Sequence, residues 1–197
     1  MVNFSISKVV NFSLDKHRSH GQDVSEINPS SYSAAHKSFS HRTTLPRDFY
    51  ERSEIAVVIL ELLDEVCRRV RAANQKGRRV GLSLTYAGFQ GGVYRAKTLP
   101  DFTDQASDLY PHLLDLLDRW WDKSGVRAVS VSLDMLETGS DAIQLSLFED
   151  RTRRHRLSEV YDEIRTKFGE TSIMRAASLL PAGQFLDRSK KIGGHYM

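Results

Sequence analysis

The stretch that decides the fold reads Arg79-Val80-Gly81-Leu82-Ser83-Leu84-Thr85-Tyr86. Apolar residues at even positions alternate with polar or small residues at odd positions, and this alternation predicts a strand with one buried face. The glycine-rich residues 88–92 predict a turn, and residues 93–99 predict a further strand that ends at Pro100. Two strands that follow each other this closely indicate a sheet.

A strand and a helix are predicted upstream of this pair. Residues 37–45 alternate in the same manner and predict a half-buried strand that ends at Pro46. Ser53 is a suitable N-cap for the helix, and Gly77 is a suitable end. The apolar residues expected on the buried side of this helix are Ile55, Val58, Ile59, Leu62, Val66 and Val70.

A second helix and a last strand follow. Thr103 is expected to open the helix, but Pro111 lies inside it, and a proline inside a helix costs about 3 kcal/mol, so we expect a kink or a later start. The inner face of this helix is expected to consist of Leu109, Leu113, Leu116, Leu117 and Trp120. Residues 128–133 alternate again. The order β-α-β-β-α-β predicts an α+β fold with four antiparallel strands and two helices on one face.

The sheet face away from the helices is predicted to carry small hydroxyl groups and cations. Its expected residues are Ser38, Ser40, Arg42, Arg79, Ser83, Thr85, Arg95, Lys97, Ser130 and Ser132. Small hydroxyl side chains let a nucleic-acid backbone approach closely, and cations bind its phosphates. Any solvent-exposed sheet face is also polar, so composition leaves both interpretations open. The near absence of Asp and Glu on these strands favours the phosphate-binding interpretation.

Charge is unevenly distributed along the chain, although the net charge is only +3. Residues 33–100 contain 12 Lys and Arg against 6 Asp and Glu. Residues 101–150 contain 3 against 11, and residues 151–197 contain 10 against 5. This pattern favours a basic surface that faces a polyanion and an acidic surface that faces solvent.

Cysteine usage and hydropathy indicate a compartment. The one cysteine, Cys67, lies within the helical apolar stripe, which suits a core position, excludes an intramolecular disulfide and fits a reducing cytoplasm. The chain has no apolar run of membrane-spanning length, and its N-terminus lacks the basic start and apolar middle of a signal peptide. We therefore expect a cytoplasmic, nucleoid-associated protein with no membrane partner.

A short peptide near the C-terminal third has the character of a docking segment. It reads Gln144-Leu145-Ser146-Leu147-Phe148 and combines a hydrogen-bonding amide with three large apolar side chains. It matches the pattern by which bacterial DNA polymerases and repair factors bind the ring-shaped sliding clamp, although a buried edge strand is the alternative. After it, apolar residues between 157 and 168 predict a short amphipathic helix that ends at Gly169, followed by a basic, irregular tail.

Several segments, in the same order, resemble one family. Lys37-Ser38-Phe39-Ser40-His41 and Thr44-Leu45-Pro46-Arg47-Asp48 resemble the first strand of the little-finger domain in Y-family (UmuC/DinB-type) translesion DNA polymerases, and residues 126–133 resemble its last strand. Residues 172–179, together with Lys191-Ile192-Gly193-Gly194-His195-Tyr196, resemble the UvrX-like UV-damage-repair branch. This resemblance runs from about residue 20 to the C-terminus.

The resemblance implies a little-finger domain that lies in the DNA major groove and binds template and primer backbones through its sheet. The DNA-binding residues expected from the resemblance and the alternation together are Lys37, Ser38, Ser40, Arg42, Arg79, Arg95, Lys97, Arg127, Ser130 and Ser132. The expected partners are primer–template DNA, the bacterial sliding clamp and a separately encoded polymerase catalytic half. A regulatory protein that occupies the clamp without DNA, or a truncated gene product, is the alternative function.

The expected domains are a thumb remnant or poorly ordered linker over residues 1–36, the little finger over 37–137, and the clamp peptide, helix and tail over 138–197. The family's polymerase activity depends on palm carboxylates that hold two Mg²⁺ ions, and no acidic-x-acidic strand precedes Lys37. We therefore expect no cofactor and no polymerisation by this chain alone. Histidines His17, His20, His36 and His41 are expected to be solvent-exposed rather than to bind a metal ion.

Overall fold

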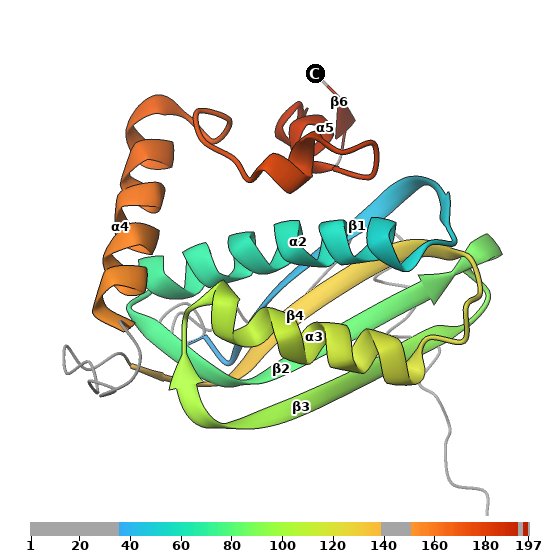
Figure 1. The fold of residues 1–197 in the computed structure, drawn as a ribbon, viewed down its shortest axis with the longest axis horizontal. Coiled ribbons are helices and arrows are strands. Elements are labelled where there is room, and N and C mark those ends of the chain that lie inside the picture. The colour runs from blue at the N-terminus through green and yellow to red at the C-terminus, as the bar shows by residue number, and fades with distance from the viewer. Residues whose placement is uncertain (1–35, 139–150, 193–194, 197) are drawn as a thin grey trace, which may run out of the picture. The chain divides into compact units, whose positions relative to one another are not determined.

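The computed structural model describes residues 36–138, 151–192 and 195–196. Its main part is a four-stranded antiparallel sheet with two long helices on one face (Figure 1). The elements of this part are β1 (Ser38–Phe49), α2 (Arg52–Ala72), β2 (Gln75–Tyr86), the 3-10 turn η2 (Ala87–Phe89), β3 (Gly92–Thr103), α3 (Ala106–Trp120) and β4 (Val126–Thr138). The predicted order β-α-β-β-α-β and the α+β class are confirmed.

The strands lie in the order β1-β4-β2-β3, and each neighbouring pair is antiparallel. Each long helix therefore connects two strands that have another strand between them: α2 joins β1 to β2 across β4, and α3 joins β3 to β4 across β2. This is the split βαβ arrangement, in which both helices return on the same side of the sheet. It leaves β1 and β3 at the two edges.

The core fills the space between the sheet and the two helices. All six residues predicted for the inner side of α2 are completely buried, as are Leu109, Leu113 and Leu117 of α3. Even-numbered residues of β2 and odd-numbered residues of β4 complete this core: Val80, Leu82, Leu84, Val129, Val131 and Leu133. Cys67 is also buried, as expected, and burial raises the pKa of its thiol far above the usual range.

Two prolines do not end their strands, contrary to prediction. β1 continues through Pro46 to Phe49, and β3 continues through Pro100 to Thr103. Both strands lie at an edge of the sheet and pair with a neighbour on one side only. The missing N–H group of a proline is tolerated in such a strand, because it can be on the unpaired side. The pairing register shifts close to each proline, between Thr44 and Phe49 in one strand and opposite Gly77 and Arg79 in the other.

The predicted limits of α2 are also wrong. Ser53 lies inside its first turn, and Glu51 occupies the cap position without a side-chain capping bond. The helix ends at Ala72, before Gly77, which lies within β2 instead. A Cβ atom at Gly77 would be 2.6 Å from Leu133 Cγ, so this glycine allows close packing inside the sheet rather than a helix stop.

The start and end of α3 differ from the expectation. The helix begins at Ala106, and Pro111 lies within it. Thr103 is the last residue of β3, and its hydroxyl accepts a hydrogen bond from the Gln105 N–H at 3.1 Å. Trp120 is 49% exposed, not inward-facing. Trp121 is buried instead, because the backbone becomes extended after the helix, and its indole N–H donates to the Ser124 carbonyl at 2.8 Å.

The predicted exposure of His41 is wrong, whereas His36 is exposed. His41 pairs with Val131 in the sheet, so it lies on the helix side of β1. Burial, with the nearby charges of Arg188 and Arg69, lowers the pKa of His41 from 6.5 to about 4. Its imidazole is therefore neutral at physiological pH.

The C-terminal part forms helix α4 (Arg151–Phe168), which stops immediately before Gly169, as predicted. The tail beyond it is not simply irregular, because it contains η3 (Ala176–Leu179), α5 (Phe185–Ser189), β5 (Lys191–Ile192) and β6 (His195–Tyr196). Three apolar side chains of α4, those of Leu157, Val160 and Phe168, are exposed. In the described part of the chain, no helix has both the length and the apolar character needed to cross a bilayer.

We predict that Leu117→Ala lowers the free energy of unfolding by about 2–5 kcal/mol, because it leaves a cavity between α3 and the sheet. Leu117 is 0% exposed, whereas Leu157 on α4 is 68% exposed, so Leu157→Ala is the matched control and should change stability by less than about 0.5 kcal/mol. Urea denaturation followed by circular dichroism measures both. Equal losses in the two variants would contradict the core described above.

Candidate nucleic-acid interface

The outer face is the side of the sheet opposite α2 and α3 (Figure 1). Cross-strand pairing aligns its side chains in rows. These rows are Ser38–Asp134–Arg79–Thr98, Ser40–Ser132–Gly81–Ala96 and Arg42–Ser130–Ser83–Tyr94. The structure thus brings six of the predicted DNA-binding residues together on one surface: Ser38, Ser40, Arg42, Arg79, Ser130 and Ser132.

The middle of the outer face is built from small residues. A Cβ atom at Gly81 would lie 2.5 Å from Ser132 Oγ and 3.0 Å from the Tyr94 hydroxyl, so a larger residue does not fit there without rearrangement. The side chains of Ser132 and Tyr94 therefore cover Gly81, which is itself buried. At one side of this region, Arg42 Nη2 donates to Thr85 Oγ1 at 3.1 Å and spans from β1 to β2. The surface therefore combines small and hydroxyl-bearing side chains with a cation held in place.

Arg95 and Lys97 do not lie on the outer face, contrary to prediction. Arg95 pairs with Leu82 and Lys97 with Val80, so both point to the helix side of β3. The Arg95 guanidinium stacks 4.2 Å from the centre of the Trp120 ring on α3.

Lys97 Nζ lies 3.4 Å from an Asp115 carboxylate oxygen, again on α3. The sequence did contain the signal, since Arg95 and Lys97 share odd positions with the apolar residues Val93 and Leu99, and alternate residues face the same side of a strand.

Arg127 and Lys37 lie at the margins of this surface. Arg127 falls in an irregular part of β4, between the paired residues Val126 and Ala128, and its Nε lies 2.7 Å from an Asp48 carboxylate oxygen. Its charge is thus balanced within the protein. Lys37 is exposed and directly precedes β1.

Sequence reasoning missed Tyr94, Thr98 and Asp134 on the outer face. Tyr94 is 50% exposed, and an exposed aromatic ring is a surface on which a base or sugar can pack. Asp134 lies between Ser38 and Arg79 in its row, and burial raises the pKa of its carboxyl although Arg79 acts in the opposite direction. The surface is therefore not free of acid, and this carboxylate opposes the binding of phosphate.

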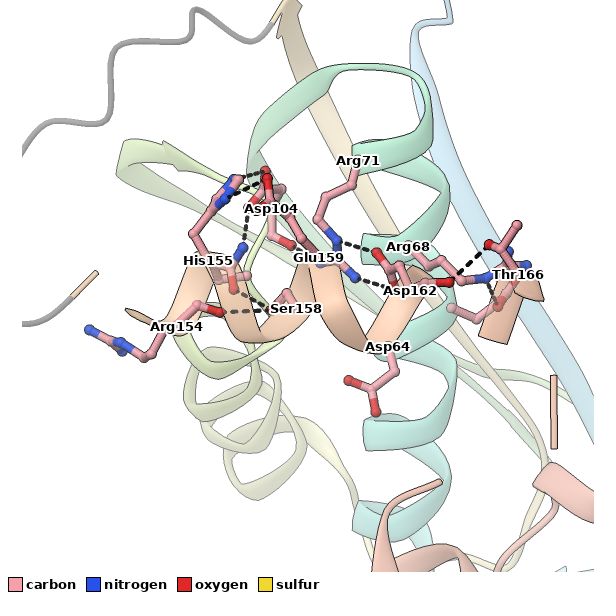
Figure 2. Close-up of polar contacts among 12 residues, drawn as sticks. Asp64, Arg68, Arg71, Asp104, Arg154, His155, Ser158, Glu159, Asp162 and Thr166 are labelled. Carbon is pink, nitrogen blue, oxygen red and sulfur yellow. Dashed lines mark hydrogen bonds and ion pairs between the residues drawn. The ribbon is translucent and has the colours of Figure 1, made fainter. Parts of the chain in front are cut away.

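A second polar surface joins α2 to α4 (Figure 2). Arg71 donates from Nε and Nη2 to the two carboxylate oxygens of Asp162, at 2.7 and 3.1 Å, and from Nη1 to the Asp104 carbonyl at 2.8 Å. His155 of α4 lies between two carboxylates, 3.7 Å from Asp104 and 3.2 Å from Glu159. These contacts flank a pocket of about 920 Å³ whose acidic and basic groups largely pair with each other.

The same side of α2 also holds the rest of the tail. Asp64 accepts two hydrogen bonds from Arg175, and the buried Glu61 accepts the backbone N–H of Gln184 at 3.0 Å. A stripe of charged residues at helical spacing was the available signal: Glu61, Asp64, Glu65, Arg68 and Arg71. This interface is a structural attachment of the tail to the domain.

The predicted clamp-binding residues Gln144, Leu145, Ser146, Leu147 and Phe148 lie outside the described residues, as do residues 1–35. The clamp peptide and the thumb remnant therefore stay predictions. The described chain resumes at Arg151, the first residue of α4.

The chain is similar in sequence to known proteins. The chain is 40% identical over 179 residues to "DNA polymerase IV 2" of Halalkalibacterium halodurans, and the match covers 90% of this chain and 43% of that protein. It is 38% identical over 182 residues to "Putative UV-damage repair protein UvrX" of Bacillus subtilis, covering 91% of this chain and 43% of that protein. The chain thus spans less than half the length of these relatives.

Among solved structures, "Complex of beta-clamp processivity factor and little finger domain of PolIV" matches with a TM-score of 0.44 at 23% identity, over 57% of this chain and 99% of that chain. The family model described as "impB/mucB/samB family C-terminal domain" matches residues 36–147, which is more than half of the 197 residues. The chain therefore belongs to the impB/mucB/samB family, the UmuC/DinB-type polymerases that its sequence resembles, and contains the C-terminal, little-finger domain of that family.

Proposed function

We propose that residues 36–138 form a DNA-binding module whose outer face binds the backbone phosphates of primer–template DNA. The observation that carries this proposal is the alignment of Arg42 and Arg79 with rows of serine on one side of the sheet, which combines charge with hydroxyl groups that can donate to phosphates. The relatives named DNA polymerase IV support DNA as the partner. The module positions DNA for a polymerase that acts in translesion synthesis during DNA repair.

We further propose that residues Gln144–Phe148 attach this module to the sliding clamp. Burial of Leu145, Leu147 and Phe148 would contribute about 1.5–3 kcal/mol each. Ordering of the peptide offsets several kcal/mol of that gain, which leaves a Kd on the order of micromolar. DNA bound at the outer face would raise the effective concentration of the peptide near a clamp on the same DNA.

The proposal places catalysis outside the described part of this chain. The resemblance implies a palm with two Mg²⁺ ions, but no group of three or more His, Cys, Asp or Glu residues within residues 36–138, 151–192 and 195–196 is arranged to hold a metal ion. These residues do not fit that role, and no chemical step is assigned to them. A catalytic palm domain, on the same or another polypeptide, is the partner that the proposal requires.

The first test compares two double variants with the same charge change on opposite faces. Arg42→Gln with Arg79→Gln should weaken binding to a primer–template duplex and reduce the slope of log K against log salt by about 0.9 for each lost phosphate contact. Arg95→Gln with Lys97→Gln should change the slope by much less, since both side chains contact α3. Fluorescence anisotropy across a salt series measures both.

Equal effects of the two double variants would refute the assignment of the outer face. A salt slope near zero for the unmodified chain would instead favour a protein that occupies the clamp without DNA.

The second test concerns the one carboxylate in the rows of the outer face. Asp134→Asn should increase DNA affinity about twofold to fivefold, or about 0.4–1 kcal/mol, because it removes a charge that repels phosphate. Since the pKa of Asp134 is raised, the native carboxyl takes up a proton more readily than in the unfolded chain. As the pH falls through that pKa, protonation of Asp134 should therefore increase both the DNA affinity and the free energy of unfolding.

Anisotropy and denaturation across a pH series measure these gains, which Asp134→Asn should remove. Asp118→Asn is the control for DNA affinity, because it makes the same charge change on α3. If the pH profile of DNA affinity persists in Asp134→Asn, Asp134 is not the group responsible.

The third test replaces Gln144, Leu147 and Phe148 with Ala in one variant. Loss of the amide and of two large apolar groups should abolish measurable clamp binding, while the unfolding transition of the domain stays unchanged. Calorimetry with purified sliding clamp measures the affinity. Leu157→Ala with Val160→Ala is the matched control, since it removes exposed apolar groups on α4. Retained clamp affinity in the triple variant would eliminate the peptide as the attachment point.

A further inference from the structure

Tyr94 places a large aromatic side chain on the outer face of the sheet. It lies on the edge strand β3 and pairs with Ser83 of β2, whose side chain faces the same way. Half of its surface is exposed. The phosphate contacts proposed above for Arg42 and Arg79 do not use this ring.

The Tyr94 ring lies along the sheet instead of pointing away from it. Gly81 is a diagonal neighbour of Tyr94, because Tyr94 pairs with Ser83 and Gly81 pairs with Ala96. A Cβ atom at Gly81 would be 3.0 Å from the Tyr94 hydroxyl oxygen and 3.2 Å from its Cε2 atom. The far end of the ring therefore rests on the Gly81 backbone, as diagonal neighbours of an aromatic residue can. One side of the ring faces the sheet, and its exposed surface faces solvent.

The side chains around the Tyr94 ring are too small to cover its solvent side. Alternate residues of a strand share a face, so Gly92 and Ala96 are its neighbours along β3. Ser83 lies opposite, and Gly81 lies beneath the end of the ring. Within the described residues, no cation and no second ring stacks on Tyr94.

Trp120 on α3 shows the contrast. Its exposure, 49%, is nearly the same as that of Tyr94, but the Arg95 guanidinium lies 4.2 Å from the centre of its ring. A cation of the protein itself thus occupies one face of Trp120. The solvent side of Tyr94 is open to a planar ligand from outside.

Two cations of the outer face lie within reach of the same ligand. Arg42 is in the same row as Tyr94, three strand spacings or about 14 Å away. Arg79 is on β2, about 13 Å along the strand from Ser83, the partner of Tyr94. A DNA strand of a few nucleotides spans these distances, so one strand can place a base on the ring and a phosphate at an arginine.

We propose that the Tyr94 ring is a stacking site for an unpaired nucleobase, so that the outer face binds single-stranded DNA by stacking as well as by phosphate contacts. The bases of an intact duplex stack on one another, and a base leaves that stack only at a cost. Stacking on an aromatic side chain accepts any base, because every base has a π face. This inference rests on the proposed function and adds to it a preference for an unpaired strand.

The experiment compares two labelled single strands of equal length and charge: oligothymidylate, and the same backbone with a stable abasic analogue at each position. Fluorescence anisotropy with the full chain should give a Kd for oligothymidylate that is lower by about fivefold or more, the effect of one stacked base. The salt slopes should be equal, because stacking releases no counterions. This comparison needs no variant, and equal affinities for the two strands would overturn the proposal.

Substitutions then identify the ring. Tyr94→Leu should lower the affinity for oligothymidylate to that for the abasic strand, because leucine still covers Gly81 but has no planar face. Tyr94→Phe keeps the ring and should keep the preference. Trp120→Leu removes a ring of nearly equal exposure from α3 and should change neither affinity. If Tyr94→Leu alters the urea unfolding transition but not the preference, the ring only covers Gly81; if Trp120→Leu removes the preference, the stacking site is not Tyr94.

Arg79→Gln separates this inference from the proposed function. It should weaken the binding of both strands by the same factor and lower both salt slopes, while the preference for bases persists. Salt-dependent binding that Arg79→Gln weakens, but without a preference for bases, would refute the stacking site alone. Absence of salt-dependent binding to either strand would refute the outer face as a DNA-binding surface, and the stacking site with it.

Discussion

Helix α2 packs its apolar side against the sheet, and the other features of the structure depend on this contact. Ile55, Ile59, Leu62 and Val66 are completely buried at this interface, and each buried side chain of this size contributes about 1.5–3 kcal/mol. Because α3 packs on the same face, the sheet has one dry side and one side that faces solvent. The free outer face is thus a direct consequence of where the helices lie.

The opposite side of α2 has a second role. Its charged residues bind the segments that follow the sheet: Arg71 binds Asp162 of α4, Asp64 binds Arg175, and Glu61 binds the backbone before α5. Ion pairs of this kind add little net stability, because desolvation of both partners offsets their attraction. They do fix which surfaces meet, and in this chain they hold α5 against the edge of β1.

The edge positions of β1 and β3 explain why these strands contain prolines and inward-facing cations. Pro46 and Pro100 lie in β1 and β3, the two strands with a neighbour on one side, and there a missing N–H group is tolerated. Arg95 and Lys97 lie on the helix side of β3, yet they remain partly exposed because the edge lets long side chains reach Trp120 and Asp115 at the rim of α3. A central strand would bury the same cations without room for water.

The order of the elements, the buried side of each helix and the hydroxyl-rich side of the sheet were predictable from the sequence. Apolar spacing reports which side of an element leaves water, and the six apolar residues predicted between Ile55 and Val70 are all buried, as are Val80, Leu82 and Leu84. Boundaries were less predictable, because Pro46 and Gly77 take conformations set by neighbouring strands, and Trp120 lies on the exposed side of the last turn of α3. The true positions of Arg95 and Lys97 followed from alternation, once Val93 and Leu99 are taken as the buried residues of the same face.

Only the tertiary structure decided that Asp134 lies beside Arg79, and that Arg188, from the tail, lies near His41 of the first strand. Such contacts join residues far apart in the chain, and local patterns of hydropathy carry no information about which distant charges the folded chain brings together.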